Sequence, residues 1–212
     1  MDAGTGFSLL TLFKLGGIFM WPLLLFSIAT ITIALERIIY IVYHNLKVDD
    51  LGKRVDVFFR KKDIEGAVKY LSAQTDRRIG ARVLLSLVNH CNLPASQVEK
   101  IVESEARCCV NSLESGFDFL VALGSVAPLT GFLGTVSGMI GAFKSIAEAT
   151  EVNAQIVAGG IYEALITTVF GLIIAIIAMV TNSLLSHSVD KFSAELEQNC
   201  SSLITYIAIH EN

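Results

Sequence analysis

The feature that most constrains this chain is the apolar stretch Gly159–Ser183, which contains one charged residue, Glu163. As a helix, the part after Glu163 is long enough to cross a hydrocarbon core about 30 Å thick. At about 100° per residue, its small and hydroxylated side chains gather on one face and its bulky apolar ones on the other. Such sorting is typical of a membrane helix that has close neighbours, or a water-filled pathway, on one side and lipid on the other. Close helix packing without any such pathway explains the sorting equally well. The small face holds Gly160, Ala164, Thr167, Thr168, Gly171, Ala175, Ala178 and Asn182.

The composition is also that of a membrane protein, since 53% of the 212 residues are hydrophobic and only 17% are charged. No basic block with interleaved aromatic residues occurs, so no nucleic-acid binding is expected. Four cysteines lie outside the long apolar runs without CxxC or Cys/His ligand spacing, which favours ordinary reduced thiols over a metal or redox site. They are Cys91, Cys108, Cys109 and Cys200.

The hydropathy pattern predicts an all-α membrane protein with three transmembrane helices, over residues 16–41, 117–143 and 160–185. Twelve Lys or Arg residues lie between 44 and 114, against one in the N-terminal stub and one in the link between the second and third spans. The positive-inside rule therefore predicts that 44–116 and the C-terminal helix 186–212 are cytoplasmic. The short N-terminus 1–15 and the link 144–159 are then periplasmic. The first span is expected to be an anchor, because no basic n-region or cleavage site precedes it.

The cytoplasmic part has helical periodicity in Asp63–Leu71 and in 78–88. Ser96 and Glu99 have capping-box spacing, which predicts the start of a longer helix. No helix breaker stands between that start and Gly116, so this helix is expected to run into the second span. The third span is expected to continue through 187–206. Separate surface helices hinged at the membrane are the alternative.

The second span carries glycines that share one face of a helix and would let another backbone approach closely. These are Gly131, Gly134, Gly138 and Gly141, and Gly160 and Gly171 have the same expected packing role in the third span. A phosphate loop is excluded because Phe143 precedes Lys144 where a glycine is required.

Three polar residues of the spans are candidate functional residues: Thr135, Glu163 and Thr168. Thr135 lies eight residues before Phe143 and Thr168 eight after Gly160, so an antiparallel hairpin would place both hydroxyls at one depth, about 12 Å below the helix ends. Each hydroxyl could instead bond only to its own helix. Glu163 is either a functional carboxylate or a structural hydrogen-bonding group at a subunit interface.

Two long blocks resemble the MotA/TolQ/ExbB proton-channel family, and within it the ExbB biopolymer-transport subunits. The first runs from Ala127-Pro128-Leu129 through Gly134-Thr135 to Ile140, and the second from Gly159 through Glu163 and Thr168 to Leu172. Glu36-Arg37 at the end of the first span also matches the usual Glu-Arg of the family.

The resemblance implies a homopentamer in the bacterial inner membrane, enclosing ExbD- or TolR-like single-span subunits whose membrane aspartate carries protons. Protons are then the coupling ion, with no other cofactor, and a TonB- or TolA-like protein receives the energy. By motif position, Thr135, Glu163 and Thr168 match the polar pore residues of the family. Ile177 departs from the pattern, since many members have proline there, and Thr167 replaces a small apolar residue.

Several functions stay open at this point. The expected one is a proton-driven motor or channel subunit for outer-membrane transport, and a TolQ-like envelope role or a gliding-motor stator is the alternative within that class. A passive membrane scaffold is a second class. An integral-membrane enzyme is disfavoured, because no His/Asp/Glu or Ser/His cluster occurs at membrane depth.

Overall fold

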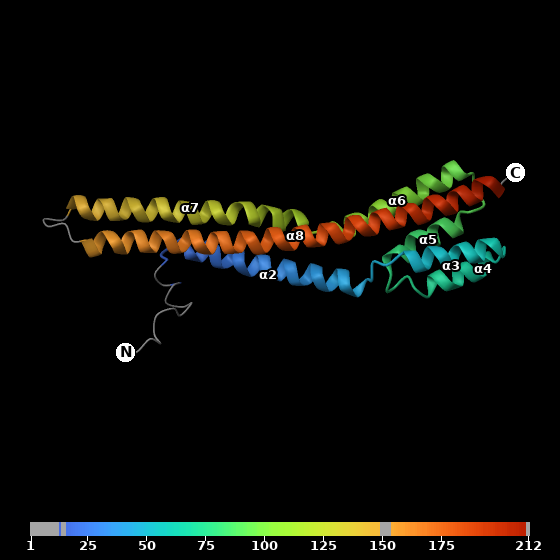
Figure 1. Cartoon of the computed structure of the whole chain (residues 1–212), viewed down its shortest axis with the longest axis horizontal. Coiled ribbons are helices and arrows are strands. Elements are labelled where there is room, and N and C mark those ends of the chain that lie inside the picture. Colours follow the sequence, from blue (N-terminus) through green and yellow to red (C-terminus); the bar gives the residue numbers. More distant parts are fainter. Residues whose placement is uncertain (1–12, 14–15, 149–153, 211–212) are drawn as a thin grey trace. The chain divides into compact units, whose positions relative to one another are not determined.

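The computed structural model describes residues 13, 16–148 and 154–210, and these contain helices joined by short turns, without strands (Figure 1). Three stretches are long and apolar enough to cross a membrane: one in α2, one in the stretch Ala95–Glu148 and one in α8. The predicted all-α fold with three membrane helices is therefore confirmed. The helices are α2 (Met20–Tyr43), α3 (Asp49–Arg60), α4 (Ile64–Ser72), α5 (Ile79–Asn89), α6 (Ala95–Glu114), α7 (Phe117–Glu148) and α8 (Ala154–His210).

The chain divides into two compact units. The membrane unit comprises residues 1–34 and 118–182, and the bundle unit comprises 35–117 and 183–212. The predicted N-terminal stub 1–15 lies almost wholly outside the described residues, as do 149–153 of the predicted periplasmic link.

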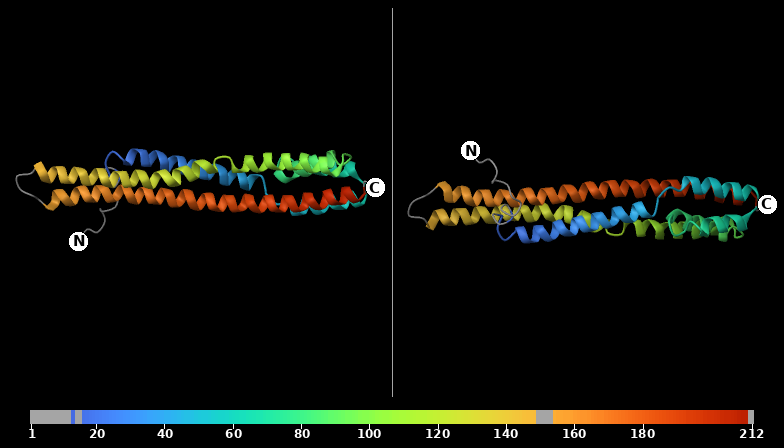
Figure 2. Two further views of the ribbon diagram at one scale, coloured as in Figure 1. Left: turned by 90° about the horizontal axis from the view of Figure 1, so that it is seen from above. Right: turned by 90° about the horizontal axis from the view of Figure 1, so that it is seen from below.

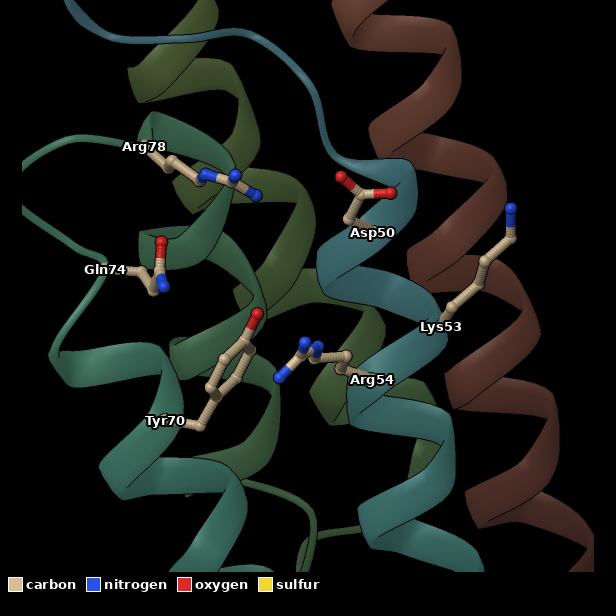
Figure 3. Close-up of a pocket in the computed structure, with 6 residues that line it drawn as sticks. All are labelled: Asp50, Lys53, Arg54, Tyr70, Gln74 and Arg78. Carbon is tan, nitrogen blue, oxygen red and sulfur yellow. The ribbon is translucent and has the colours of Figure 1, made fainter.

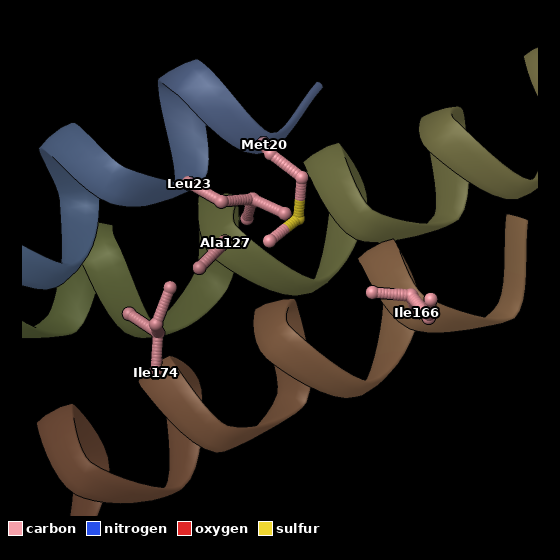
Figure 4. Close-up of a cluster of buried hydrophobic side chains, with 5 residues drawn as sticks. All are labelled: Met20, Leu23, Ala127, Ile166 and Ile174. Carbon is pink, nitrogen blue, oxygen red and sulfur yellow. The ribbon is translucent and has the colours of Figure 1, made fainter. Parts of the chain in front are cut away.

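The membrane unit consists of α7, the first part of α8 and the start of α2. Figures 1 and 2 show α7 side by side with α8. Figure 4 shows a buried cluster to which all three helices contribute. Large apolar side chains such as Phe132, Leu165 and Ile176 are more than half exposed on the outer faces of this unit. Such a surface suits lipid, because hydrocarbon gives polar groups no partners and penalises them. The buried cluster consists of Met20, Leu23, Ala127, Ile166 and Ile174.

The bundle unit contains α3 to α6 and the last part of α8. Its helices form where the sequence has helical periodicity, and their apolar faces are buried against one another. Asp63 caps α4, since the backbone N–H of Gly66 donates to Asp63 Oδ1 at 2.9 Å. The fully buried apolar side chains include Leu51, Val55, Leu71, Leu84, Leu87, Leu113, Phe192, Leu196 and Leu203.

The start of the helix predicted near Ser96 is confirmed, since α6 begins at Ala95 with Pro94 at its N-cap, but no capping box forms there. The prediction that this helix runs unbroken into the second span is wrong, since Ser115 is extended and Gly116 has φ +89° between α6 and α7. A left-handed residue ends a helix, and glycine adopts that conformation at little cost. The third span, by contrast, does continue as one helix to His210.

Candidate functional site

Close contact between α7 and α8 is made possible by the glycines of α7. A Cβ at Gly131 would lie 2.7 Å from the backbone oxygen of Thr167, and one at Gly138 would lie 2.9 Å from Ala164 Cβ. At Gly134 a Cβ would lie 2.8 Å from Thr167 Cβ. Any larger side chain at these positions would therefore separate the two helices.

The same close approach is seen from the α8 side. A Cβ at Gly171 would lie 2.6 Å from the backbone oxygen of Ala127, and one at Gly160 would lie 2.7 Å from Ala142 Cβ. Gly141 differs from the other predicted packing glycines, since nothing lies within 4 Å of the position its Cβ would occupy. Like Gly134, Gly138 and Gly160, it lines the cavity described below.

Two hydroxyls of α8 converge on one carbonyl of α7. Thr167 Oγ1 and Thr168 Oγ1 each lie 3.1 Å from the backbone oxygen of Gly131. Thr167 is buried and can alternatively donate to the oxygen of Ala164, at 2.7 Å, within its own helix. A hydroxyl has one proton to donate, so Thr167 can serve only one of these oxygens at a time. Thr167 is therefore part of the α7–α8 contact, which its sequence position alone does not reveal.

The contacts of the glycines fix the register of α7 against α8, and Thr135 and Thr168 do not lie at one depth. Gly131 is opposite Thr167 and Thr168, and Gly138 is opposite Gly160 and Ala164. Interpolation places Thr135 opposite Ala164, about one helical turn, or roughly 5 Å, from Thr168. The equal-depth prediction fails because it assumed that both spans end at the same level. Thr135 is half-buried and its hydroxyl donates to the oxygen of Phe132, at 2.6 Å.

Glu163 lines a cavity of about 350 Å³ between α7, α8 and the residues before α2. Two hydroxyl-bearing side chains, Ser137 and Ser145, line the same cavity, as does Gly141. A Cβ at Gly17 would collide with Glu163 Oε1. The carboxylate of Glu163 therefore lies against the backbone that leads into α2, and Glu163 as a whole is exposed. The cavity can hold a charged group and polar ligands at a depth where the rest of the unit is apolar.

Two buried polar atoms of the membrane unit were not singled out as site residues. Thr30 Oγ1 and Asn182 Oδ1 are buried and have no hydrogen-bond partner among the described residues. Buried polar atoms normally have hydrogen-bond partners, so these two oxygens are exceptions to the usual pattern. In the sequence, Thr30 is simply a hydroxyl-bearing residue within an apolar span. Such residues are too common in membrane helices for Thr30 to be recognised as a special position.

The cysteines of the bundle unit behave as structural thiols. Cys109 and Cys200 are buried, and burial raises the pKa of Cys109 to about 11 and that of Cys200 to about 12. A raised pKa leaves a thiol protonated and unreactive at neutral pH. Within the described part of the chain, no three His, Cys, Asp or Glu side chains are placed to hold a metal ion together.

Fold and site together define a class: a multi-pass helical membrane subunit with a tightly packed helix pair and one carboxylate in a polar cavity at membrane depth. The model of the "MotA/TolQ/ExbB proton channel family" matches residues 73–198. The chain belongs to this family, whose members are channel and stator subunits and not enzymes, and it is a multi-pass inner-membrane protein.

Individual relatives carry transport and envelope names. The chain is 30% identical over 187 residues to the biopolymer transport protein exbB1 of Vibrio cholerae, which covers 85% of this chain and 80% of that protein. It is 32% identical over 114 residues to ExbB of Pseudomonas putida, and this match covers 54% of this chain but only 33% of that protein. It is 43% identical over 77 residues to the Tol-Pal system protein TolQ of Haemophilus influenzae, and this match covers 36% of this chain and 34% of that protein. The resemblance of the two sequence blocks is thereby confirmed.

Proposed function

We propose that this protein is the proton-channel subunit of an inner-membrane motor that uses the proton motive force to energise a periplasm-spanning TonB-like protein for outer-membrane transport. The observation that carries the proposal is the placement of Glu163 in a polar cavity beside the α7–α8 contact. A carboxylate at membrane depth is costly unless it has a function or a partner. Relatives named as biopolymer transport proteins support a role in transport.

A partner with a second carboxylate completes the pathway in this proposal. Glu163 is the one acidic or basic residue between 160 and 186, and none occurs between 119 and 143. One carboxylate cannot relay a proton across the whole membrane. An ExbD- or TolR-like single-span subunit with a membrane aspartate would provide the missing group, and a homopentamer of this chain would enclose it.

The proton motive force is sufficient for such a step. One elementary charge crossing 100 mV releases about 2.3 kcal/mol, which is enough to shift a two-state equilibrium by nearly two orders of magnitude. Threonine and serine hydroxyls can both donate and accept hydrogen bonds, so they can hold water in line toward the partner's aspartate. In this proposal Thr135 and Thr168 do so, with Glu163 at the outer end.

The test is proton flux into liposomes that contain this chain with or without the single-span protein encoded beside it. We expect flux that needs both proteins and that falls strongly when the partner's membrane aspartate is changed to asparagine. No flux with the partner would contradict the proposal and leave a passive scaffold, and equal flux without the partner would contradict a pathway that needs the partner's aspartate. A pH-sensitive dye inside the liposomes gives the measurement.

The proposed topology has a periplasmic N-terminus and a cytoplasmic C-terminus, in line with the excess of Lys and Arg between α2 and α6. Single cysteines at Lys61 and Ser193 should react with a membrane-impermeant maleimide only from the cytoplasmic side, and one at Ala147 only from outside. Labelling of the Lys61 position from outside would overturn the orientation. The equivalent probes at Ser8 and within 149–153 fall outside the described residues.

A TolQ-like role in envelope maintenance is the second candidate, because the match to a TolQ protein has the higher identity over its shorter range. Complementation distinguishes the two roles. Rescue of gradient-dependent uptake across the outer membrane in a strain that lacks its ExbB supports transport, and rescue of envelope integrity in a strain that lacks its TolQ supports the envelope role.

A further inference from the structure

A basic hollow of about 460 Å³ lies in the bundle unit, between α3 and the region where α4 leads into α5. Figure 3 shows its six lining residues: Asp50, Lys53, Arg54, Tyr70, Gln74 and Arg78. Arg54, Tyr70 and Arg78 face the hollow from different helices, whereas Lys53 points away from it. All six belong to one compact unit.

Two guanidinium groups of the hollow lack an acidic partner. Arg54 lies over the ring of Tyr70, 5.4 Å from its centroid, and Arg78 has no ion pair with any residue that the structure describes. Lys53 is already paired, since its Nζ lies 2.7 Å from Asp49 Oδ2. The cation–π contact fixes the position of Arg54 without neutralising its charge. Unpaired guanidinium groups in a concave site favour anions.

The surroundings strengthen the positive potential. Between residues 47 and 82 the chain carries ten Lys or Arg against six Asp or Glu, although its overall net charge is −4. Arg78 is the N-cap of α5, and that helix begins without a side-chain cap and without an acidic residue in its first turn. The partial positive charge of a helix N-terminus therefore adds to the charge of Arg78.

Given the proposed topology, the hollow faces the cytoplasm beyond the layer of lipid headgroups. Gly52, two residues before Arg54, packs against the side chain of Asn199. Asn199 is fourteen residues beyond Leu185, where the third span is predicted to end, which is about 21 Å along the helix. Because the headgroup layer is only roughly 5–8 Å thick, a soluble phosphate reaches this site more readily than a lipid headgroup does.

We propose that this hollow binds a phosphate group, with Arg54 and Arg78 as its charged donors and Tyr70 and Gln74 as neutral donors. The phosphate comes either from the headgroup of an anionic phospholipid or from a soluble phosphate in the cytoplasm. Asp50, which lines the same hollow, repels any anion and limits the affinity. Bidentate contacts from a guanidinium match the oxygens of a phosphate, which explains arginine and not lysine at both positions.

The experiment uses the full chain in detergent and has two arms. In the first, native mass spectrometry measures retention of phosphatidylglycerol, with phosphatidylcholine as the zwitterionic comparison. In the second, calorimetric titration measures binding of inorganic phosphate. We expect saturable binding in at least one arm; saturation only with phosphatidylglycerol assigns the lipid source, and saturation with inorganic phosphate assigns the soluble one.

Matched variants assign the binding to the hollow. The double change Arg54→Gln, Arg78→Gln should weaken binding at least tenfold, whereas Arg60→Gln, Arg77→Gln removes the same charge from outside the hollow and should change it less than twofold. Asp50→Asn should tighten binding about threefold, and Tyr70→Phe, which keeps the ring under Arg54, should weaken it about threefold. The last two variants leave the arginines in place, so they test the site even if the double variant does not fold.

Absence of binding by the wild-type chain in both arms would overturn the proposal. Equal losses in the two double variants would do so too, because they would show attraction by net charge alone. Unchanged binding in Asp50→Asn and Tyr70→Phe together would place the phosphate somewhere else.

Discussion

The backbone of Gly17 lies directly against the carboxylate of Glu163, so that a Cβ on this glycine would collide with Glu163 Oε1. Gly17 also has φ +66°, a left-handed conformation that residues with a side chain adopt at a cost. Two independent properties of glycine, its size and its backbone freedom, are therefore both used at this position. The residue that precedes the first span thus fixes where the carboxylate of the third span can lie.

Gly17→Ala should displace the Glu163 carboxylate and lower proton-dependent activity severalfold, with a cost of about 1–2 kcal/mol for the backbone conformation. Gly159→Ala is the matched control, since nothing lies within 4 Å of its Cβ position. Gradient-dependent uptake, measured beside the amount of assembled protein, checks the prediction. Equal activity of the two variants would show that Gly17 does not position the carboxylate.

The glycine contact between α7 and α8 predicts that alanine has opposite effects on stability at Gly134 and at Gly141. Gly134→Ala should destabilise the protein by about 1–3 kcal/mol, because the added methyl group overlaps Thr167. Gly141→Ala should be neutral or stabilising by up to about 1 kcal/mol, since alanine is the better helix former and the space is open. Thermal unfolding in detergent, followed by circular dichroism, compares the two.

The larger changes Gly134→Leu and Gly138→Leu should also disrupt the oligomer, because the α7–α8 pair on which any ring depends would separate. If detergent-purified Gly134→Leu keeps both the melting temperature and the oligomer mass of the wild type, the packing role of this face is wrong.

The sequence predicts the spans well, because a length of about 20 apolar residues and a 3.6-residue period are local properties. It does not predict the break at Gly116, since one glycine inside a helical pattern is usually tolerated. The depths of Thr135 and Thr168 depend on the register between α7 and α8. That register is set by pairs such as Gly138 and Ala164, which no single segment reveals.

In the site, too, the sequence predicts residues with a distinctive local context and misses residues whose role depends on a distant contact. Glu163 stands out in the sequence because it is a carboxylate within an apolar run. The role of Gly17 is invisible there, because it depends on a contact between residues 146 positions apart in the chain. Thr167 stands out in the sequence only because it replaces a small apolar residue of the family pattern, whereas in the structure it is buried and shares the Gly131 carbonyl with Thr168. Which of two adjacent helical residues contacts a neighbouring helix can be decided only when the position of that helix is known.

The cysteines predict an order of chemical modification in the bundle unit. With a pKa of about 11, Cys109 carries about one thiolate per thousand molecules at pH 8, and Cys200, with a pKa of about 12, carries fewer. N-ethylmaleimide at pH 8 should therefore modify the exposed Cys108 at least ten times faster than either buried thiol. Mass spectrometry of peptides at successive times gives the three rates.

The same thiols make stability depend on alkaline pH. Their folded pKa lies above the unfolded value of about 9, so the folded state holds these protons more tightly. The resulting stabilisation is fully present below pH 9 and is lost as the pH rises through 11 to 12. Cys200→Ala should flatten this part of the pH dependence, and a slope unchanged by the substitution would assign it to other groups.

The last prediction concerns the proposed proton pathway and is tested by changing threonine to valine, which replaces a hydroxyl group by a methyl group. Valine has nearly the shape of threonine but neither donates nor accepts hydrogen bonds. Thr135→Val should therefore leave assembly largely intact, and Thr168→Val should lose only its hydrogen bond to Gly131 O. Each should lower gradient-dependent uptake by tenfold or more per assembled protein, while Thr135→Ser should be milder. Glu163→Gln should be intermediate if the group acts by hydrogen bonding and severe if its charge is needed.

The control for Thr135 is Thr130, five residues earlier on the same helix. Both threonines are half-buried, and each donates to a carbonyl of its own helix: Thr130 to Val126 at 3.0 Å and Thr135 to Phe132 at 2.6 Å. Thr130→Val thus makes the same chemical change on a different face of α7 and should leave uptake unchanged. Thr167→Val is the control for Thr168→Val, because each removes a hydroxyl 3.1 Å from Gly131 O and should cost similar stability through the α7–α8 contact, whereas only Thr168→Val should lower uptake strongly. Full activity of the Thr135→Val, Thr168→Val double variant would mean that both threonines only pack the helices together.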